Sequence, residues 1–72
     1  MKTKYYYLYV KETGMQDFKG FNLEFGIYND GYPSAIAYTK ENIRKLKQFA
    51  AQNFDIEGVQ LRDAEGHIVW NY

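Results

Sequence analysis

Apolar side chains form an unbroken run near the start of this chain, where all residues from Tyr5 to Val10 are aromatic or aliphatic. Side chains of a strand point alternately to opposite faces, so a strand here has two apolar faces. One face would carry Tyr6, Leu8 and Val10, and the other Tyr5, Tyr7 and Tyr9. We predict a strand over about residues 3–11 whose first face packs in the core. The tyrosines of the second face must then meet solvent, a partner chain or a ligand.

A second alternation covers about residues 21–28 and predicts a half-buried strand. Its apolar side holds Phe21, Leu23, Phe25 and Ile27, and its opposite side holds Asn22, Glu24, Gly26 and Tyr28. A turn at Asp30-Gly31 would lead into a third strand. A two-residue type I′ turn sets Phe25 opposite Ile36, whereas a three-residue turn sets it opposite Ala35. We expect the two-residue turn, because its register gathers the larger apolar groups.

The next segment has helical spacing. Thr39 is a suitable N-cap, whose hydroxyl can accept a hydrogen bond from the amide of residue 41 or 42. The helix should continue to about residue 53 and pack on the sheet. Its predicted apolar stripe consists of Ile43, Leu46, Ala50 and Phe54, with Lys47 and Phe49 at the margins.

The last part of the chain predicts a hairpin. A strand at about residues 59–63 leads into Asp63-Ala64-Glu65-Gly66, a three-residue hairpin turn with Gly66 in the left-handed conformation. This turn sets Leu61 opposite Val69 and Gln60 opposite Trp70. Val59, Leu61 and Val69 would then point to the core, whereas Ile68, Trp70 and Tyr72 would point away from it with Arg62.

These elements predict an α+β fold: one domain over residues 1–72, with a mostly antiparallel sheet in the chain order β-β-β-α-β-β and one helix on one face. The order of the strands in space stays open. The predicted core residues are Tyr6, Leu8, Val10, Leu23, Phe25, Ile27, Ile36, Ile43, Leu46, Ala50, Phe54, Val59, Leu61 and Val69.

Composition narrows the possible functions. The chain has 72 residues, no cysteine, and nine basic against nine acidic side chains. The lack of cysteine suits a reducing, cytoplasmic setting, and no bilayer span or secretory leader is expected. Zero net charge weakens the argument for nucleic acid or anionic lipid as a partner. The charges are unevenly spread, because residues 40–52 hold four basic side chains against Glu41, and residues 53–72 hold Arg62 against four carboxylates.

The candidate partner-binding residues lie on the predicted outer face of the sheet. They are Tyr5, Tyr7, Tyr9, Tyr28, Ile68, Trp70, Tyr72 and Arg62. Their combined ring area exceeds the apolar patch that monomers usually expose. Three coverings are possible: a protein partner or second copy of the chain, single-stranded nucleic acid stacked on the rings with lysines at its phosphates, or the loop at residues 12–20. For that loop we predict that Met15 and Phe18 fold back on the core.

A secondary basic ridge is expected on one flank of the helix, at Lys40, Arg44 and Lys47. Its side chains could grip an acidic partner or simply lie in water over the apolar stripe. Groups for catalysis are sparse, since His67 is the one histidine, and its neighbours Asp63 and Glu65 suit turn geometry. We therefore expect a non-enzymatic protein-binding or regulatory module, a homodimer or docked to another protein, with no cofactor, metal or small-molecule substrate. The alternative is a weak binder of single-stranded nucleic acid.

Overall fold

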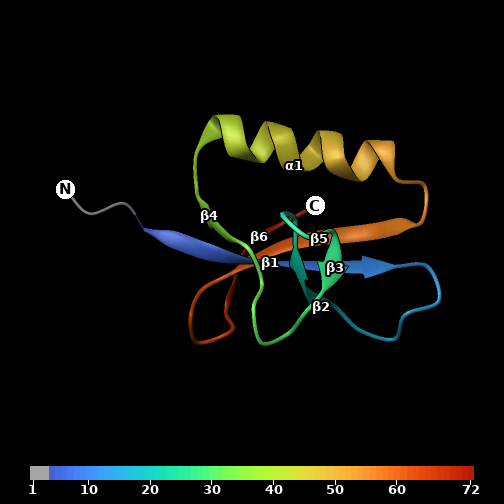
Figure 1. The fold of residues 1–72 in the computed structure, drawn as a ribbon. Helices are drawn as coiled ribbons and strands as arrows, with labels where there is room; N and C mark the ends of the chain where they lie inside the picture. Colours follow the sequence, from blue (N-terminus) through green and yellow to red (C-terminus); the bar gives the residue numbers. More distant parts are fainter. Residues whose placement is uncertain (1–3) are drawn as a thin grey trace.

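The structure is a computed structural model that describes residues 4–72. Within these residues the sheet contains β1 (Tyr5–Glu12), β2 (Lys19–Asn22), β3 (Ile27–Tyr28), β4 (Ala35–Ala37), β5 (Ile56–Arg62) and β6 (Ile68–Asn71). The helix α1 (Lys40–Gln52) connects β4 to β5 and covers one side of the sheet (Figure 1). All strand pairings are antiparallel. The predicted α+β class is therefore confirmed, with the strand order β3-β2-β1-β5-β6 and β4 also paired to β1.

The core forms around the pairing of β1 with β5. Leu8 lies opposite Leu61 and Val10 opposite Val59, and all four side chains are fully buried. Each such side chain contributes about 1.5–3 kcal/mol when it leaves water. Leu46 of α1 is buried on top of them. Tyr6, Ile36, Ile43 and Ala50 pack around this centre as partly buried groups, so nine of the predicted core residues are confirmed.

The helix begins as the sequence predicts and ends one residue before the expected Asn53. The Thr39 hydroxyl accepts a hydrogen bond from the amide of Asn42 at 3.1 Å. The Asn53 side chain donates to the Phe49 carbonyl at 2.7 Å as the helix ends. Phe54 then lies past the last turn and is 99% exposed, so its predicted core position is wrong. Phe49 and Ile56 pack on the core instead. No helix among residues 4–72 is long and apolar enough to span a membrane.

The predicted strand over residues 21–28 is instead a hairpin. After Asn22 the chain turns through residues 23–26, with Gly26 at a φ of 66° and its amide donating to the Asn22 carbonyl. The Asn22 side chain accepts a hydrogen bond from the amide of Phe25 and donates one to the Tyr32 carbonyl, both at 3.1 Å. The turn moves Leu23, Phe25 and Ile27 to exposed positions, so their core assignment is wrong. Phe21 and Tyr28 pack against the core in their place.

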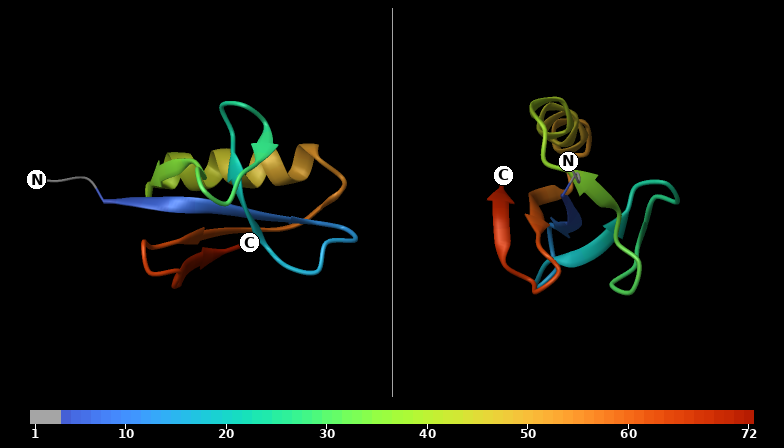
Figure 2. Two further views of the ribbon diagram at one scale, coloured as in Figure 1. Left: turned by 60° about the horizontal axis from the view of Figure 1, so that its bottom comes forward. Right: turned by 90° about the vertical axis from the view of Figure 1, so that its left-hand side faces the viewer.

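The expected turn at Asp30-Gly31 is present, but the strands beside it do not pair as predicted. The Tyr32 amide donates to the Asn29 carbonyl, and neither central residue has a positive φ, so the turn is not type I′. Instead of pairing with residues 21–28, β4 pairs with the first half of β1, where Ile36 lies opposite Tyr6. The second half of the same β1 edge pairs with β2. The β2–β3 hairpin consequently lies crosswise to β1 and projects beside α1 (Figures 1 and 2).

A bulge divides the C-terminal hairpin into two registers. Near the turn the prediction is confirmed, because the Asp63 amide donates to the His67 carbonyl and Gly66 has a φ of 89°. The register then shifts by one residue, and Trp70 lies opposite Leu61 rather than opposite Gln60. A shift of one residue moves each following side chain to the other face of the sheet. Trp70 therefore packs against the core, and Val69 is exposed, contrary to prediction.

We predict that Gly20→Ala lowers the free energy of unfolding by about 1–3 kcal/mol, because the new methyl group has no room. A Cβ atom at residue 20 would lie 2.8 Å from the Asn29 carbonyl oxygen and 3.0 Å from the Asp30 Cα, both parts of the backbone. Gly31→Ala is the matched control, since its nearest contact would be 3.5 Å. Urea denaturation measures both variants, and an equal effect of the two would contradict the steric explanation.

Candidate functional site

On the outer face of the sheet, which points away from α1, Arg62 contacts Tyr9 of β1 and Gln60 of β5. The Arg62 guanidinium lies 4.3 Å from the centroid of the Tyr9 ring, close enough for a cation–π contact. It also donates two hydrogen bonds to Gln60 Oε1, at 3.0 and 2.8 Å. Gln60 is buried on this face. The contacts that Arg62 and Tyr9 could have offered to a partner are thus partly used within the molecule.

Phe18 covers a further part of the outer face. Its ring would lie 2.9 Å from a Cβ atom at Gly58, so the bare glycine backbone is the surface on which it rests. The Arg62 guanidinium is 5.8 Å from the centroid of the same ring. The loop at residues 12–20 therefore covers the outer face with Phe18, and the prediction that Phe18 packs on the core is wrong. Met15 stays local, with its sulfur 3.3 Å from the Glu12 amide.

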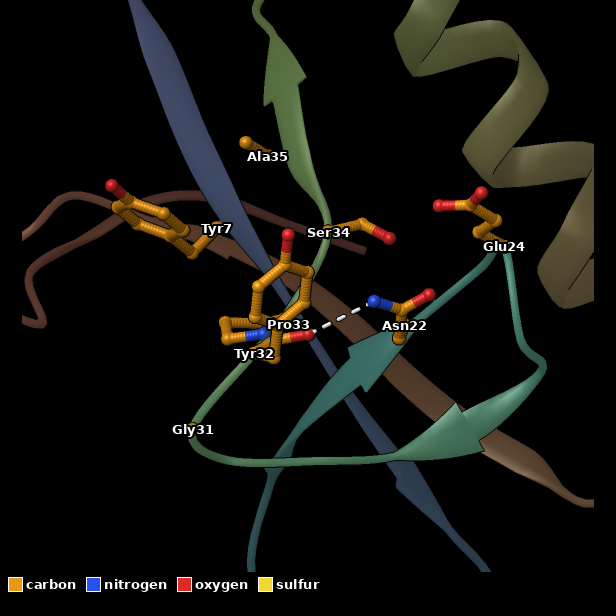
Figure 3. A pocket seen from close by; sticks show the side chains of 8 residues that line it. All are labelled: Tyr7, Asn22, Glu24, Gly31, Tyr32, Pro33, Ser34 and Ala35. Atoms are coloured by element: carbon orange, nitrogen blue, oxygen red, sulfur yellow. Dashed lines mark hydrogen bonds between the residues drawn. The ribbon is translucent and has the colours of Figure 1, made fainter.

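A pocket of about 420 Å³ remains open between β1, β2 and the segment before β4. Tyr7 and Tyr32 reach it from segments far apart in the sequence, and Asn22 donates to the Tyr32 carbonyl beside it (Figure 3). Tyr32 is exposed, and Tyr5 of the same β1 face is 56% exposed. Of the predicted partner-binding residues, Tyr5 and Tyr7 thus remain available on the outer face near this pocket. Ile68 is also exposed and lies opposite Arg62.

Three of the predicted partner-binding residues are not on the outer face. Tyr28 packs edge-on against Phe21 at 5.0 Å between ring centroids, because the hairpin turn changes its direction. Trp70 and Tyr72 follow the bulge and lie on the side of α1, with their rings parallel and 5.9 Å apart. The sequence-based assignment of Tyr28, Trp70 and Tyr72 to one outer surface with Tyr7 is therefore wrong.

This rearrangement brings Tyr72 to the predicted basic ridge. The Lys47 ammonium lies 5.7 Å from the centroid of the Tyr72 ring. On the same flank of α1 is a groove of about 500 Å³, which we call the basic groove. It is lined by Tyr38, Lys40, Ile43, Arg44 and Lys47. Tyr38 in turn packs edge-on against Tyr6, 5.9 Å between centroids. The groove thus combines one exposed phenol ring, three cations and an apolar floor at Ile43, and a second exposed ring, Tyr72, lies beside Lys47 at its edge.

The cations of the basic groove have no ion-pair partner within residues 4–72. Lys45, on the opposite flank of α1, lies 3.6 Å from Glu41, and Lys11 lies 2.9 Å from Glu57. Lys40, Arg44 and Lys47 form no comparable contact with any carboxylate of the described chain. The spacing of these three residues along the helix predicts that they share one flank. The contact of Tyr72 with Lys47 depends on the bulge in β5–β6, which no pattern in the sequence indicates.

The His67 cluster serves the turn between β5 and β6. Asp63 Oδ1 accepts hydrogen bonds from the amides of Glu65 and His67 at 2.9 and 2.8 Å. The His67 ring nitrogen Nδ1 lies 3.2 Å from Asp63 Oδ2 and 3.6 Å from Glu65 Oε2. The carboxylate of Asp63 is occupied by backbone amides and holds the turn closed. Within the described part of the chain, no group of three or more His, Cys, Asp or Glu side chains could hold a metal ion.

Comparison of the chain with protein-family models, curated proteins and solved structures found no match. Of the surfaces described above, the basic groove is the one where exposed rings, an apolar floor and unpaired charge meet.

We predict that Asp63→Asn makes stability less dependent on pH in acid. The pKa of Asp63 lies below its usual value of 3.8, chiefly because the His67 amide donates to the carboxylate. A lowered pKa means that the stabilisation is complete above the unfolded value and is lost as pH falls through the folded value. Asparagine keeps an acceptor oxygen but does not titrate. Urea denaturation between about pH 5 and pH 2 should show a smaller loss for Asp63→Asn than for the wild type. The control is Asp55→Asn, and equal losses in all three chains would contradict this role of Asp63.

Proposed function

We propose that this chain is a non-enzymatic protein-binding module whose basic groove takes an acidic segment of a partner protein. The observation that carries the proposal is the position of Tyr72 beneath Lys47, which joins exposed aromatic surface to the cations of α1. Aromatic side chains are enriched at the centres of protein interfaces, and complementary charge selects and steers the partner. The lack of cysteine suits a reducing cytoplasmic setting for this binding.

The groove favours a partner with both carboxylates and apolar side chains. Ile43 is half-buried at the floor and, with Tyr38, offers apolar contact, while Lys40, Arg44 and Lys47 stand around it. A purely acidic ligand would leave the apolar floor wet, and a purely apolar one would leave the cations without partners. Alternating acidic and apolar side chains satisfy both parts.

A second copy of the chain fits this groove poorly. Symmetric dimers place the same surface patch of both copies face to face. Contact through the groove would bring the Lys40, Arg44 and Lys47 side chains of two copies together, and like charges at an interface weaken binding. We therefore favour a foreign acidic partner over the homodimer.

A random peptide library selected on the wild-type chain tests the proposal. Enriched peptides should carry acidic and apolar residues together, and their binding should change the fluorescence of Trp70, which stacks on Tyr72. Arg44→Glu should weaken the peptides about tenfold, equivalent to roughly 1.4 kcal/mol. Lys45→Glu is the matched control, because Lys45 lies on the other flank of α1.

Three results would contradict the proposal. They are peptides without acidic bias, peptides that bind Arg44→Glu as tightly as the wild type, and an oligonucleotide that binds the groove in a salt-dependent way when peptides do not. The last result would establish the nucleic-acid alternative. A dimer in sedimentation that Arg44→Glu dissociates would instead show that a second copy occupies the groove.

A further inference from the structure

A second cavity, of about 490 Å³, lies between the β2–β3 hairpin and the C-terminal end of α1. Its volume is in the range of small-ligand sites. Four aromatic rings and two carboxylates line it, namely Phe21, Tyr28, Phe49, Phe54, Glu12 and Asp55. No lysine or arginine is among its lining residues. We call this cavity the acidic cleft, and it is distinct from the basic groove.

One wall of the acidic cleft is a continuous series of contacts. The Phe49 and Phe21 rings lie 5.6 Å apart, and Phe21 meets Tyr28 edge-on at 5.0 Å. The Tyr28 hydroxyl then donates to Glu12 Oε1 at 2.7 Å. Burial raises the pKa of Tyr28, and the hydrogen bond to Glu12 raises it further, so the phenol stays neutral and keeps donating. Glu12 Oε2 has no hydrogen-bond partner within residues 4–72.

The electrostatic field in the acidic cleft favours a positive ligand. The helix ends here, and its last turn contains no basic residue to oppose the negative end of the dipole. The Asp55 and Glu12 carboxylates add negative charge at the same place. Lys11, which follows Val10 on β1, forms its ion pair with Glu57 instead. Nothing that lines the cleft supplies a positive charge.

Phe54 adds an aromatic surface that the fold does not use. Its side chain is 99% exposed although it lines the cleft. Aromatic rings attract an ammonium group over their faces, and aromatic cages with a nearby carboxylate recognise alkylated ammonium ions. We propose that the acidic cleft binds an alkylammonium group, with Glu12 as its counter-charge and the Tyr28, Phe49 and Phe54 rings around its carbon atoms.

Choline and 3,3-dimethylbutan-1-ol, an uncharged molecule of the same shape, test this proposal. In a titration followed by NMR, choline should shift the amide signals of Gly26, Tyr28 and Phe54 in a saturable way. The alcohol should bind at least about tenfold more weakly, because it lacks the charge that the rings attract. An equal response to the two molecules would overturn the proposal.

Two variants test the residues. Phe54→Ala removes a side chain that is fully in water, and Glu12→Gln keeps an acceptor for the Tyr28 hydroxyl, so both should fold normally. Each should weaken choline at least about fivefold. Phe25→Ala is the matched control, since Phe25 is 66% exposed and does not line the cleft. Wild-type affinity in both Phe54→Ala and Glu12→Gln would overturn the proposal.

The source of the ammonium group is distinguished by N-acetyl-lysine methylamide and its trimethylated form. Tighter binding of either than of choline assigns the cleft to a lysine side chain of a protein, and the reverse order assigns it to a free small molecule. The basic groove is not involved, so Arg44→Glu should leave choline binding unchanged. Failure of the peptide experiment therefore leaves this inference standing, and failure of the choline titration leaves the proposed function standing.

Discussion

The rest of the structure depends on two cross-strand pairs, Leu8 with Leu61 and Val10 with Val59. They account for the largest fully buried side chains of the described residues and fix the register between the two central strands. Because side chains alternate, this register places Tyr9 and Gln60 together on the opposite face. The stacked Arg62 and the buried Gln60 amide are consequences of the same register, not independent features of the outer surface.

The small size of the chain explains why so many rings lie outside the core. One helix over a sheet this short covers a limited area, and a domain near this length buries a smaller fraction of its surface than a larger domain does. The shared edge of β1 turns the β2–β3 hairpin away from the sheet plane, and Phe25 in its turn is 66% exposed. Phe54 follows the end of α1 and is likewise left in water. Of these two exposed rings, Phe54 lines the acidic cleft and Phe25 does not.

The two proposed sites differ in charge because they lie on different parts of α1. The basic groove follows the flank that holds Lys40, Arg44 and Lys47, and the acidic cleft lies at the C-terminal end, where the helix dipole is negative. A neutral chain thus contains one positive and one negative surface, each next to aromatic rings. The net charge of zero is the sum of these positive and negative surfaces and does not show that the charges are separated. A charged partner would respond to the local charge of one surface.

The sequence by itself determined the fold class, the Thr39 cap, the central strands and the turns at Asp30-Gly31 and Asp63–Gly66, because these depend on local periodicity and turn chemistry. It also placed Lys40, Arg44 and Lys47 on one flank of the helix. Only the tertiary structure decided that the chain turns between Asn22 and Gly26, that β4 pairs with β1, and that a bulge turns Trp70 and Tyr72 toward α1. The turn at residues 22–26 is closed by local hydrogen bonds, but the apolar alternation of residues 21–28 conceals it. The other two depend on which distant strand offers the better pairing. A shift of one residue in register moves each side chain of a strand to the opposite face of the sheet, and the apolar pattern of the sequence fits both registers almost equally well.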